Sequence, residues 1–234
     1  MEDLPGWVAA QTKARNILKN RYFSALADGA MGREQFLATQ QQFFFAVRYF
    51  SRPMAALMAR MPSSVQRRSL IHNLAEEHGF VDEKAAVFDP ALAHDMTFLR
   101  FLETLGVTRG AMSHVREEEA VRAFNTSLMG LCLMERPEVA FACLGIIEQE
   151  FAGISARLGR TVVERGWVPA EKLVHYNVHE EIDGRHAAEF FDCVAEAWAA
   201  GGGDRAAVQD GVRLGLHVFD RLYEDLWDAA AAPP

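Results

Sequence analysis

Three histidines and an aspartate are gathered in the short segment HYNVHEEIDGRH, which begins at His175. On an α-helix each residue advances by about 100°, so His179, Asp183 and His186 lie within roughly 60° of one another. His175 lies on the same stripe, one turn earlier. Two imidazoles and a carboxylate that converge from one helix face are suitable ligands for iron, manganese or zinc. A histidine-rich helix face can also be a pH-sensitive or simply polar surface, so the segment alone leaves both interpretations open.

A buried ligand set must be completed by donors on other helices, and three further residues meet that requirement. Glu77 lies on the apolar stripe of SLIHNLAEE, His94 begins the stripe of HDMTFLRFLETL, and Glu148 shares a face with small residues in CLGIIEQEFAGIS. Small residues beside an acid indicate a cavity there. Burying an unpaired carboxylate costs several kcal/mol, so each acid needs a cationic partner. Arg or Lys could be that partner, but three carboxylates and three histidines on inward faces of four helices favour a binuclear metal site.

The same helical geometry assigns neighbouring acids to the surface. Glu180 and Glu181 project away from the stripe of His179 and are expected to face solvent. Glu76 is four residues from His72, so the two are expected to pair across one turn of a surface helix.

Helical periodicity extends over nearly the whole chain, and strand-like alternation is almost absent. Glycines and prolines mark the ends of the expected helices, Pro53 is expected to break or kink one of them, and residues 80–91 are expected to form a loop. These signals predict an all-α protein, a single domain of residues 1–234 formed by a bundle of seven to eight helices, with a frayed tail from about residue 229. The expected helices cover about residues 7–28, 32–61, 63–78, 92–105, 114–134, 138–165, 170–200 and 204–230.

Composition and charge narrow the functional class. The chain has 234 residues, of which 50% are hydrophobic, and a net charge of -8 without any Lys/Arg-rich block, so a globular protein that does not bind nucleic acid is expected. No stretch reaches the roughly 18 uncharged apolar residues that span a bilayer, and the acidic start MEDLPGWVAA lacks a signal-peptide core. A cytoplasmic protein without membrane contact is therefore expected. Cys132, Cys143 and Cys193 have no zinc-site spacing and lie in apolar runs, which predicts buried thiols.

The order of the candidate ligands resembles that of the haem-oxygenase-like diiron oxidases and oxygenases. In that family a Glu near the end of one helix is followed by a His opening the next, a Glu in a later helix, and a His-x3-Asp-x2-His motif. The corresponding segments here are NLAEEHG, AHDMTFLRFLETLG, LGIIEQE and HEEIDGRH, and QQQFFFAVRYFSRPMAALMARMP is similar to the family's second helix. The resemblance covers nearly the whole domain. Ferritin-like proteins match less well, because the sequence contains no Glu-x-x-His.

The resemblance implies a haem-oxygenase-like helical fold and a centre of two iron ions, with manganese as an alternative metal. Its ligands would be Glu77, His94, Glu148, His179, Asp183 and His186. The first three of these would hold one iron and the last three the other, with carboxylates bridging. His175 either orients one of the ligands or is only a polar residue near the start of its helix, and both roles stay open. The loop before His94 is longer than is usual in the family, so Glu76 and His78 stay open as alternatives to Glu77 and His94.

The same resemblance implies an enzyme of specialised biosynthesis that activates O2 as a co-substrate. Its organic substrate would be a small amino acid, an amine or a fatty acid, and the reaction N-oxygenation, desaturation or oxidative cleavage of a C–C bond. The pocket walls are expected to come from QQQFFFAVRYF and from the helix of Glu148. Two alternatives stay open: a metal-independent enzyme of the same fold, such as the cofactor-ring-oxidising or thiamin-degrading relatives, and a non-enzymatic helical protein that binds metal or a ligand. The oligomeric state is also open, with a homodimer as one option.

Overall fold

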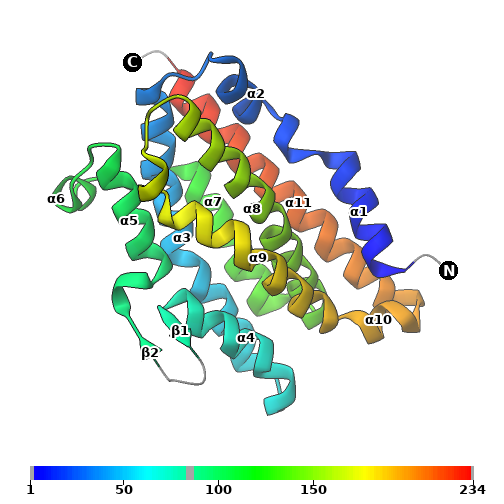
Figure 1. The fold of residues 1–234 in the computed structure, drawn as a ribbon. Coiled ribbons are helices and arrows are strands. Elements are labelled where there is room, and N and C mark those ends of the chain that lie inside the picture. Colours follow the sequence, from blue (N-terminus) through cyan, green and yellow to red (C-terminus); the bar gives the residue numbers. More distant parts are fainter. Residues whose placement is uncertain (1–2, 83–86, 233–234) are drawn as a thin grey trace.

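The computed structural model describes residues 3–82 and 87–232, which form a bundle of long helices (Figure 1). The body of the bundle consists of α3 (Arg33–Arg60), α7 (Glu119–Met134), α8 (Pro137–Glu164) and α11 (Gly202–Ala231). Helix α9 (Val174–Asp192) lies along α8, and α4 (Ser64–Glu77) and α5 (His94–Thr104) pack between α9 and α3. Four segments that are far apart in the sequence, α4, α5, α8 and α9, therefore meet on one side of the bundle.

Shorter elements connect and cover these helices. Helices α1 (Leu4–Arg15) and α2 (Arg21–Asp28), joined by a 3-10 turn (Ile17–Lys19), run beside α11, and α6 (Arg109–Met112) and α10 (Ala195–Ala200) are brief. Two further 3-10 turns are Pro90–Leu92 and Ala170–Lys172. The predicted loop 80–91 contains an antiparallel pair, β1 (Phe80–Asp82) and β2 (Val87–Phe88), in which Phe80 lies opposite Phe88. The all-α prediction is confirmed, because this pair contains all the β-structure in the described residues.

Two predicted helices are divided into shorter ones. Asn16 interrupts the helix expected over 7–28: its φ of 50° is left-handed, a conformation that asparagine tolerates and that commonly ends helices. The helix expected over 170–200 is interrupted at residues 193–194, between α9 and α10. Pro53, which was expected to break or kink a helix, lies inside α3 without ending it. Helix α11 continues to Ala231, into the predicted tail, and residues 233–234 lie outside the described residues.

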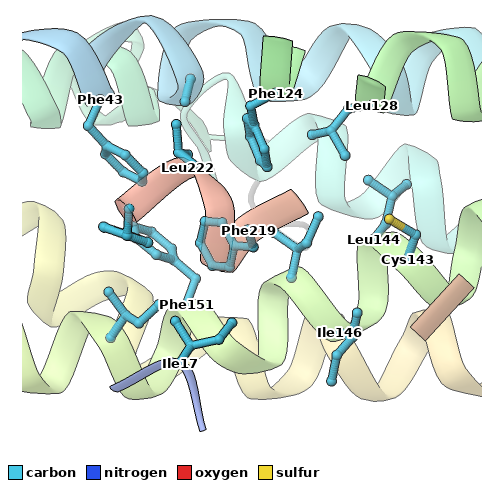
Figure 2. Close-up of a cluster of buried hydrophobic side chains, with 14 of the residues drawn as sticks. Ile17, Phe43, Phe124, Leu128, Cys143, Leu144, Ile146, Phe151, Phe219 and Leu222 are labelled. Atoms are coloured by element: carbon cyan, nitrogen blue, oxygen red, sulfur yellow. The ribbon is translucent and has the colours of Figure 1, made fainter. Parts of the chain in front are cut away.

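Apolar side chains of α3, α7, α8 and α11 make up most of the part of the core drawn in Figure 2. The ring of Phe43 lies 5.6 Å from that of Phe151, and Phe124 stacks on Phe219 at 5.8 Å. Aromatic pairs at such distances contribute about 0.5–1.5 kcal/mol beyond their area burial. These four phenylalanines also form much of the wall of the cavity described below.

Helix α8 is long and apolar enough to cross a bilayer, although no stretch of that kind was expected from the sequence. Its most apolar window is 78% buried inside the bundle. A helix that is apolar on most of its faces is typical of a protein core as well as of a membrane. Glycines of α11 contribute to this burial, since a Cβ on Gly211 or Gly215 would collide with α8, against Val139 and Ile146 respectively.

The prediction of three buried thiols is correct for two cysteines and wrong for the third. Cys132 and Cys143 are buried in the core, whereas Cys193 is exposed. Cys193 directly follows the end of α9, where the chain turns toward α10, and its Sγ lies 3.2 Å from the hydroxyl oxygen of Ser69. The apolar residues around it in the sequence therefore do not carry its side chain into the core.

Candidate metal centre

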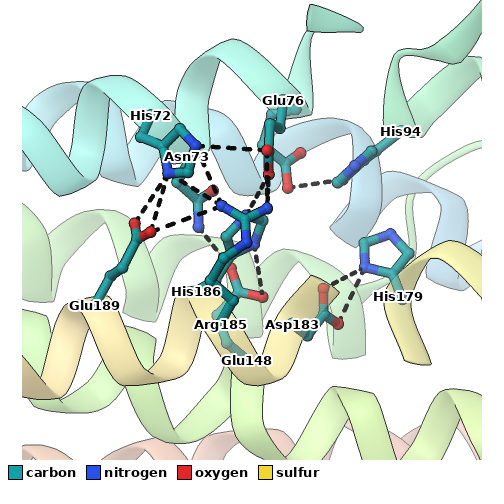
Figure 3. A network of polar contacts seen from close by, with 11 residues as sticks. His72, Asn73, Glu76, His94, Glu148, His179, Asp183, Arg185, His186 and Glu189 are labelled. Carbon is teal, nitrogen blue, oxygen red and sulfur yellow. Dashed lines mark hydrogen bonds and ion pairs between the residues drawn. The ribbon is translucent and has the colours of Figure 1, made fainter. Parts of the chain in front are cut away.

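The six predicted ligands are buried together where α4, α5, α8 and α9 meet (Figure 3). None of them is more than 8% exposed. They come from α4 (Glu77), α5 (His94), α8 (Glu148) and α9 (His179, Asp183 and His186). The helical phase deduced from the sequence therefore places all six side chains on the inward faces of their helices.

One compact set of donors lies where α8 meets α9. One ligand atom each from Glu148, Asp183 and His186 lie within 4.8 Å of one another, and no other set of three in the described chain is so close. Nδ1 of His186 is 3.9 Å from Oε2 of Glu148 and has no hydrogen-bond partner. Gly145 lets α9 approach, because a Cβ there would lie only 3.2 Å from Cβ of Phe190. Glu148 is thus grouped with these two residues of α9, and not with the α4 and α5 donors as expected.

The remaining three donors form a second, more open set. The antiparallel pairing of β2 with β1 brings the chain back toward α4, and His94, at the start of α5, donates from Nδ1 to Oε1 of Glu77 at 2.9 Å. The rings of His94 and His179 lie 4.4 Å apart. His179 donates from Nδ1 to both carboxylate oxygens of Asp183, at 2.8 and 3.0 Å, and its buried Nε2 has no partner. The His179–Asp183 contact joins the two sets into one cluster.

The two open alternatives to the predicted ligands are placed differently. His78 is exposed, and its Nδ1 lies 2.7 Å from the backbone oxygen of Leu74, so it points away from the cluster. Glu76 accepts a hydrogen bond from Nε2 of His186 at 2.5 Å and two from Arg185 at 2.8 Å. It was expected to pair with His72 on the surface; that contact exists at 3.6 Å, but the crossing of α4 over α9 brings Glu76 onto His186 as well.

Asn73 belongs to the site and was missed from the sequence. It is 1% exposed, and its side-chain amide donates to Oε1 of Glu148 at 3.3 Å, while its own oxygen has no partner. Asn73 lies four residues before Glu77, so the spacing that places Glu77 inward also places Asn73 there. That spacing is the signal that could have identified it.

Two other predictions for α9 concern residues beside the ligands. Glu180 is exposed, as expected, and the side chain of Glu181 lies outside the described residues. His175 is 1% exposed and makes its hydrogen bond to Thr97, on α5, and not to any of the six predicted ligands.

Burial and neighbouring charges shift the protonation of the cluster. Burial, with the nearby Glu148, raises the pKa of Asp183 well above its usual value. Burial, with the nearby His94, lowers the pKa of His179 to about 3, so its imidazole is neutral. Burial alone would lower the pKa of His186, but Glu148 and Glu76 outweigh it and raise this pKa to about 10. Without a metal, His186 is therefore a cation at neutral pH, and Asp183 keeps its proton to a higher pH than an ordinary aspartate.

Binding of a divalent cation is therefore expected to release protons and to become tighter as the pH rises. Nδ1 of His186 offers a lone pair only after the imidazolium loses a proton, which becomes less costly as the pH approaches 10 from below. Asp183 acts in the same direction, whereas His179 is already neutral. Each proton released should raise the affinity about tenfold per pH unit. Calorimetric titration with Mn(II), in buffers of different ionisation enthalpy on either side of neutrality, measures both effects; a pH-independent affinity would contradict the expectation.

The donor chemistry fits iron or manganese. Oxygen and imidazole donors without thiolate disfavour a structural zinc site and suit redox-active first-row metals. Nε2 of His179 and Nδ1 of His186 are buried ring nitrogens without a hydrogen-bond partner, and such a group costs about 1–3 kcal/mol unless something binds it. In the described contacts, no Lys or Arg forms an ion pair with Glu77, Glu148 or Asp183. Among these contacts only histidines lie beside the three carboxylates, so a bound metal ion would supply the positive charge that Lys or Arg does not.

A cavity of about 40 Å³ opens beside the cluster. It is large enough to hold at least one water molecule. Glu77, His94, Glu148 and His179 line one side, and no Lys, Arg or Cys lines the described wall. The expected origin of the walls, α3 and the helix of Glu148, is confirmed, with α7 and α11 completing them. The apolar lining residues are Phe43, Ala46, Val47, Phe50, Phe124, Ile147, Phe151 and Phe219.

A family model and several named proteins match most of this chain. A family model described as iron-containing redox enzyme matches residues 37–220, a range that includes all six candidate ligands. The chain is 24% identical to the 4-aminobenzoate synthase of Chlamydia pneumoniae over 179 residues, which is 76% of this chain and 75% of that protein. It is also 24% identical to the enzyme of the same name from Chlamydia trachomatis over 177 residues, 75% of this chain and 72% of that protein.

Solved structures show the same fold at lower sequence identity. A domain of unknown function with a haem-oxygenase-like fold from Shewanella denitrificans aligns with a TM-score of 0.75 and 16% identity, over 97% of this chain and 91% of the other. A CADD-like protein of unknown function from Nostoc punctiforme aligns with a TM-score of 0.72 and 15% identity, over 94% and 91% of the two chains. A TenA homologue from Pyrococcus furiosus aligns with a TM-score of 0.64 and 13% identity, over 96% of this chain and 98% of the other. The predicted haem-oxygenase-like fold is confirmed.

Proposed function

This chain belongs to the family of iron-containing redox enzymes, and we propose that it is a non-haem diiron oxidase or oxygenase with O2 as co-substrate. The observation that supports this best is the buried cluster itself. Three carboxylates and three imidazoles from four helices converge without a Lys or Arg partner among the described contacts, beside an apolar cavity. Such donor sets in helix bundles typically hold two iron or manganese ions.

The geometry suggests how the donors would be shared. Glu148, Asp183 and His186 would hold one ion, as the compact set. The second set would hold the other ion, with a carboxylate bridging between them; it consists of Glu77, His94 and His179. Two ferrous ions, when bound, supply electrons for the reduction of O2.

The surrounding residues hold these donors in place. Glu76 accepts a hydrogen bond from the N–H at Nε2 of His186. Nδ1 of the same ring is therefore the nitrogen that faces Glu148. Arg185 in turn fixes Glu76 with two hydrogen bonds, so the outer edge of the site is tied to α9. Asn73 orients the Glu148 carboxylate by donating to one of its oxygens. These contacts thus fix the orientation of the ligands, and they determine that Nε2 of His186 keeps its proton once the imidazolium loses one.

The lining of the cavity indicates that the part of the substrate next to the metals is apolar. Its walls outside the ligands carry no charged side chain in the described part of the chain, so a zwitterionic amino acid would find no partner for its charges except at the metals. A hydrocarbon or aromatic portion placed next to the cluster suits the ring of phenylalanines. Of the substrate classes expected from the sequence, we therefore favour the fatty-acid-like one, and an aromatic molecule, which was not among those classes, fits the same walls. The relatives named 4-aminobenzoate synthase support a role in biosynthesis.

A thiamin-degrading enzyme of the same fold has no support in this site. That chemistry needs a cysteine nucleophile in the pocket. Cys132 and Cys143 are buried in the core, Cys193 is exposed beside Ser69, and none of them lines the described cavity.

Filling the cavity should slow the reaction with O2 without loss of metal. Ala46 lines the cavity and is 4% exposed, so Ala46→Leu would place added side-chain atoms in the space beside the ligands. If excluding O2 costs about 1.4 kcal/mol or more, the rate of O2 consumption by Fe(II)-loaded protein falls about tenfold or more. An oxygen electrode measures the rate, and Ala55→Leu, on the exposed face of the same helix, is the control. Equal rates in the two variants would show that O2 does not use this cavity.

A further inference from the structure

His175 has the same arrangement of ring nitrogens as two of the candidate ligands. His179 and His186 each have one nitrogen in a hydrogen bond to a carboxylate and the other buried without a partner. His175 has Nδ1 in a hydrogen bond to Thr97 at 2.9 Å, and its Nε2 is also buried without a partner. It is 1% exposed, so water outside the protein cannot reach that nitrogen.

The partner of His175 determines which nitrogen carries the proton. The hydroxyl of Thr97 has one hydrogen, which it donates to the backbone oxygen of His94 at 2.9 Å. Thr97 can therefore only accept from His175, so Nδ1 of His175 is the protonated nitrogen and Nε2 is a bare lone pair. An anchored N–H on one side and a free lone pair on the other is the state in which histidines bind metals.

The ring of His175 lies beside those of two candidate ligands. His175 precedes His179 by one turn of α9, and their rings lie 4.3 Å apart. The ring of His179 is equally close to that of His94, at 4.4 Å, while His175 and His94 are 6.3 Å apart. His179 therefore lies between two imidazoles, at the more open end of the cluster. Phe98 packs edge-on against His175 at 4.8 Å and helps to fix the plane of its ring.

We propose that His175 supplies a seventh donor to the metal centre, through Nε2, at the end of the cluster occupied by His94 and His179. This assignment rests on the proposed function, because it adds a further ligand to the same metal centre. In this arrangement Thr97 is the residue that positions His175, and through the His94 carbonyl it ties the start of α5 to α9. The open set would then have three imidazoles and one carboxylate.

Proton NMR of the protein loaded with Co(II) alone counts the bound imidazoles directly. Co(II) accepts similar ligands and does not react with O2 as Fe(II) does, and each bound histidine gives a strongly shifted, solvent-exchangeable N–H signal from its other nitrogen. With ¹⁵N-labelled histidine, we expect one such signal each from His94, His175, His179 and His186. His175→Phe should remove one signal and keep the rest, and the exposed His217→Phe should remove none.

A second variant keeps the test decisive if His175→Phe does not fold. Thr97→Val preserves the shape but removes the acceptor of the His175 N–H, so one shifted signal should exchange faster with solvent while Co(II) stays bound. Bound Co(II) with signals from only three histidines in the unmodified protein would overturn the assignment of His175 and leave the metal centre intact. Failure of the protein to bind Co(II) at all would overturn the proposed function, and the His175 assignment with it.

Discussion

Replacing Asp183 with alanine is expected to abolish binding of at least one iron ion per chain. Asp183 is fully buried, belongs to the compact set with Glu148 and His186, and accepts both hydrogen bonds from His179. It is therefore the carboxylate that touches both sets of donors. Removing an outer hydrogen-bond partner of a ligand already costs about 10–100-fold in metal affinity, so loss of this carboxylate should cost more. Metal analysis after anaerobic loading with Fe(II) and desalting measures the retained iron.

The control for this experiment lies three residues earlier on the same helix. Glu180 is exposed, so Glu180→Ala should retain as much iron as the unmodified protein. Helical circular dichroism of Asp183→Ala should also be preserved, because its carboxyl is buried at a cost and its removal leaves no apolar cavity of significant size. Full iron retention in Asp183→Ala would remove this residue from the site. Loss of iron in Glu180→Ala would show that the face of α9 has been misidentified.

The largest loss of stability is expected from Gly211→Ala. A Cβ at this position would collide with the backbone carbonyl of Val139 and lie 2.9 Å from Cβ of Ala142, both on α8. A backbone carbonyl cannot rotate away, so α11 would have to move off α8, and the packed phenylalanines between them would separate. Overpacking of this kind typically costs about 1–3 kcal/mol and occasionally more, which exceeds the helix-propensity gain of about 1 kcal/mol for replacing glycine. Denaturant unfolding measures the change in the free energy of unfolding.

Gly153→Ala is the matched control for this substitution. Gly153 lies on α8, is exposed, and has open space where a Cβ would be. The change should stabilise the protein by up to about 1 kcal/mol, because it lowers the conformational freedom of the unfolded chain without a clash. If Gly211→Ala proved as stable as Gly153→Ala, the close approach of α8 and α11 would be incorrect.

The candidate ligands could be located from the sequence because each depends on the phase of a single helix. Spacings of four and three place His179, Asp183 and His186 on one stripe whatever the rest of the chain does. An acid or histidine on an apolar stripe must face the core, and the structure places Glu77, His94 and Glu148 there. The division between the two sets was not predictable in this way, because it depends on how closely α8 and α9 approach at Gly145.

The features that the sequence did not reveal depend on contacts between helices or on local backbone conformation. Glu76 was assigned to the surface because its helical partner His72 is in the same segment, whereas its contact with His186 exists only once α4 crosses α9. The break at Asn16 leaves the apolar pattern on either side uninterrupted, so periodicity cannot detect it. Cys193 was expected to be buried because its sequence neighbours are apolar. It lies just past the end of α9, where the chain turns, and its side chain is exposed.

We propose that one buried cluster holds two iron ions. An anaerobic titration with Fe(II), followed by quantification of the metal bound per chain, tests this proposal most directly. The buried, unpartnered nitrogens of His179 and His186 lie in different sets of donors, which predicts saturation close to two ions per chain. Uptake of no iron by the folded protein would contradict the claim, and saturation at one ion per chain would contradict the pairing of the two sets.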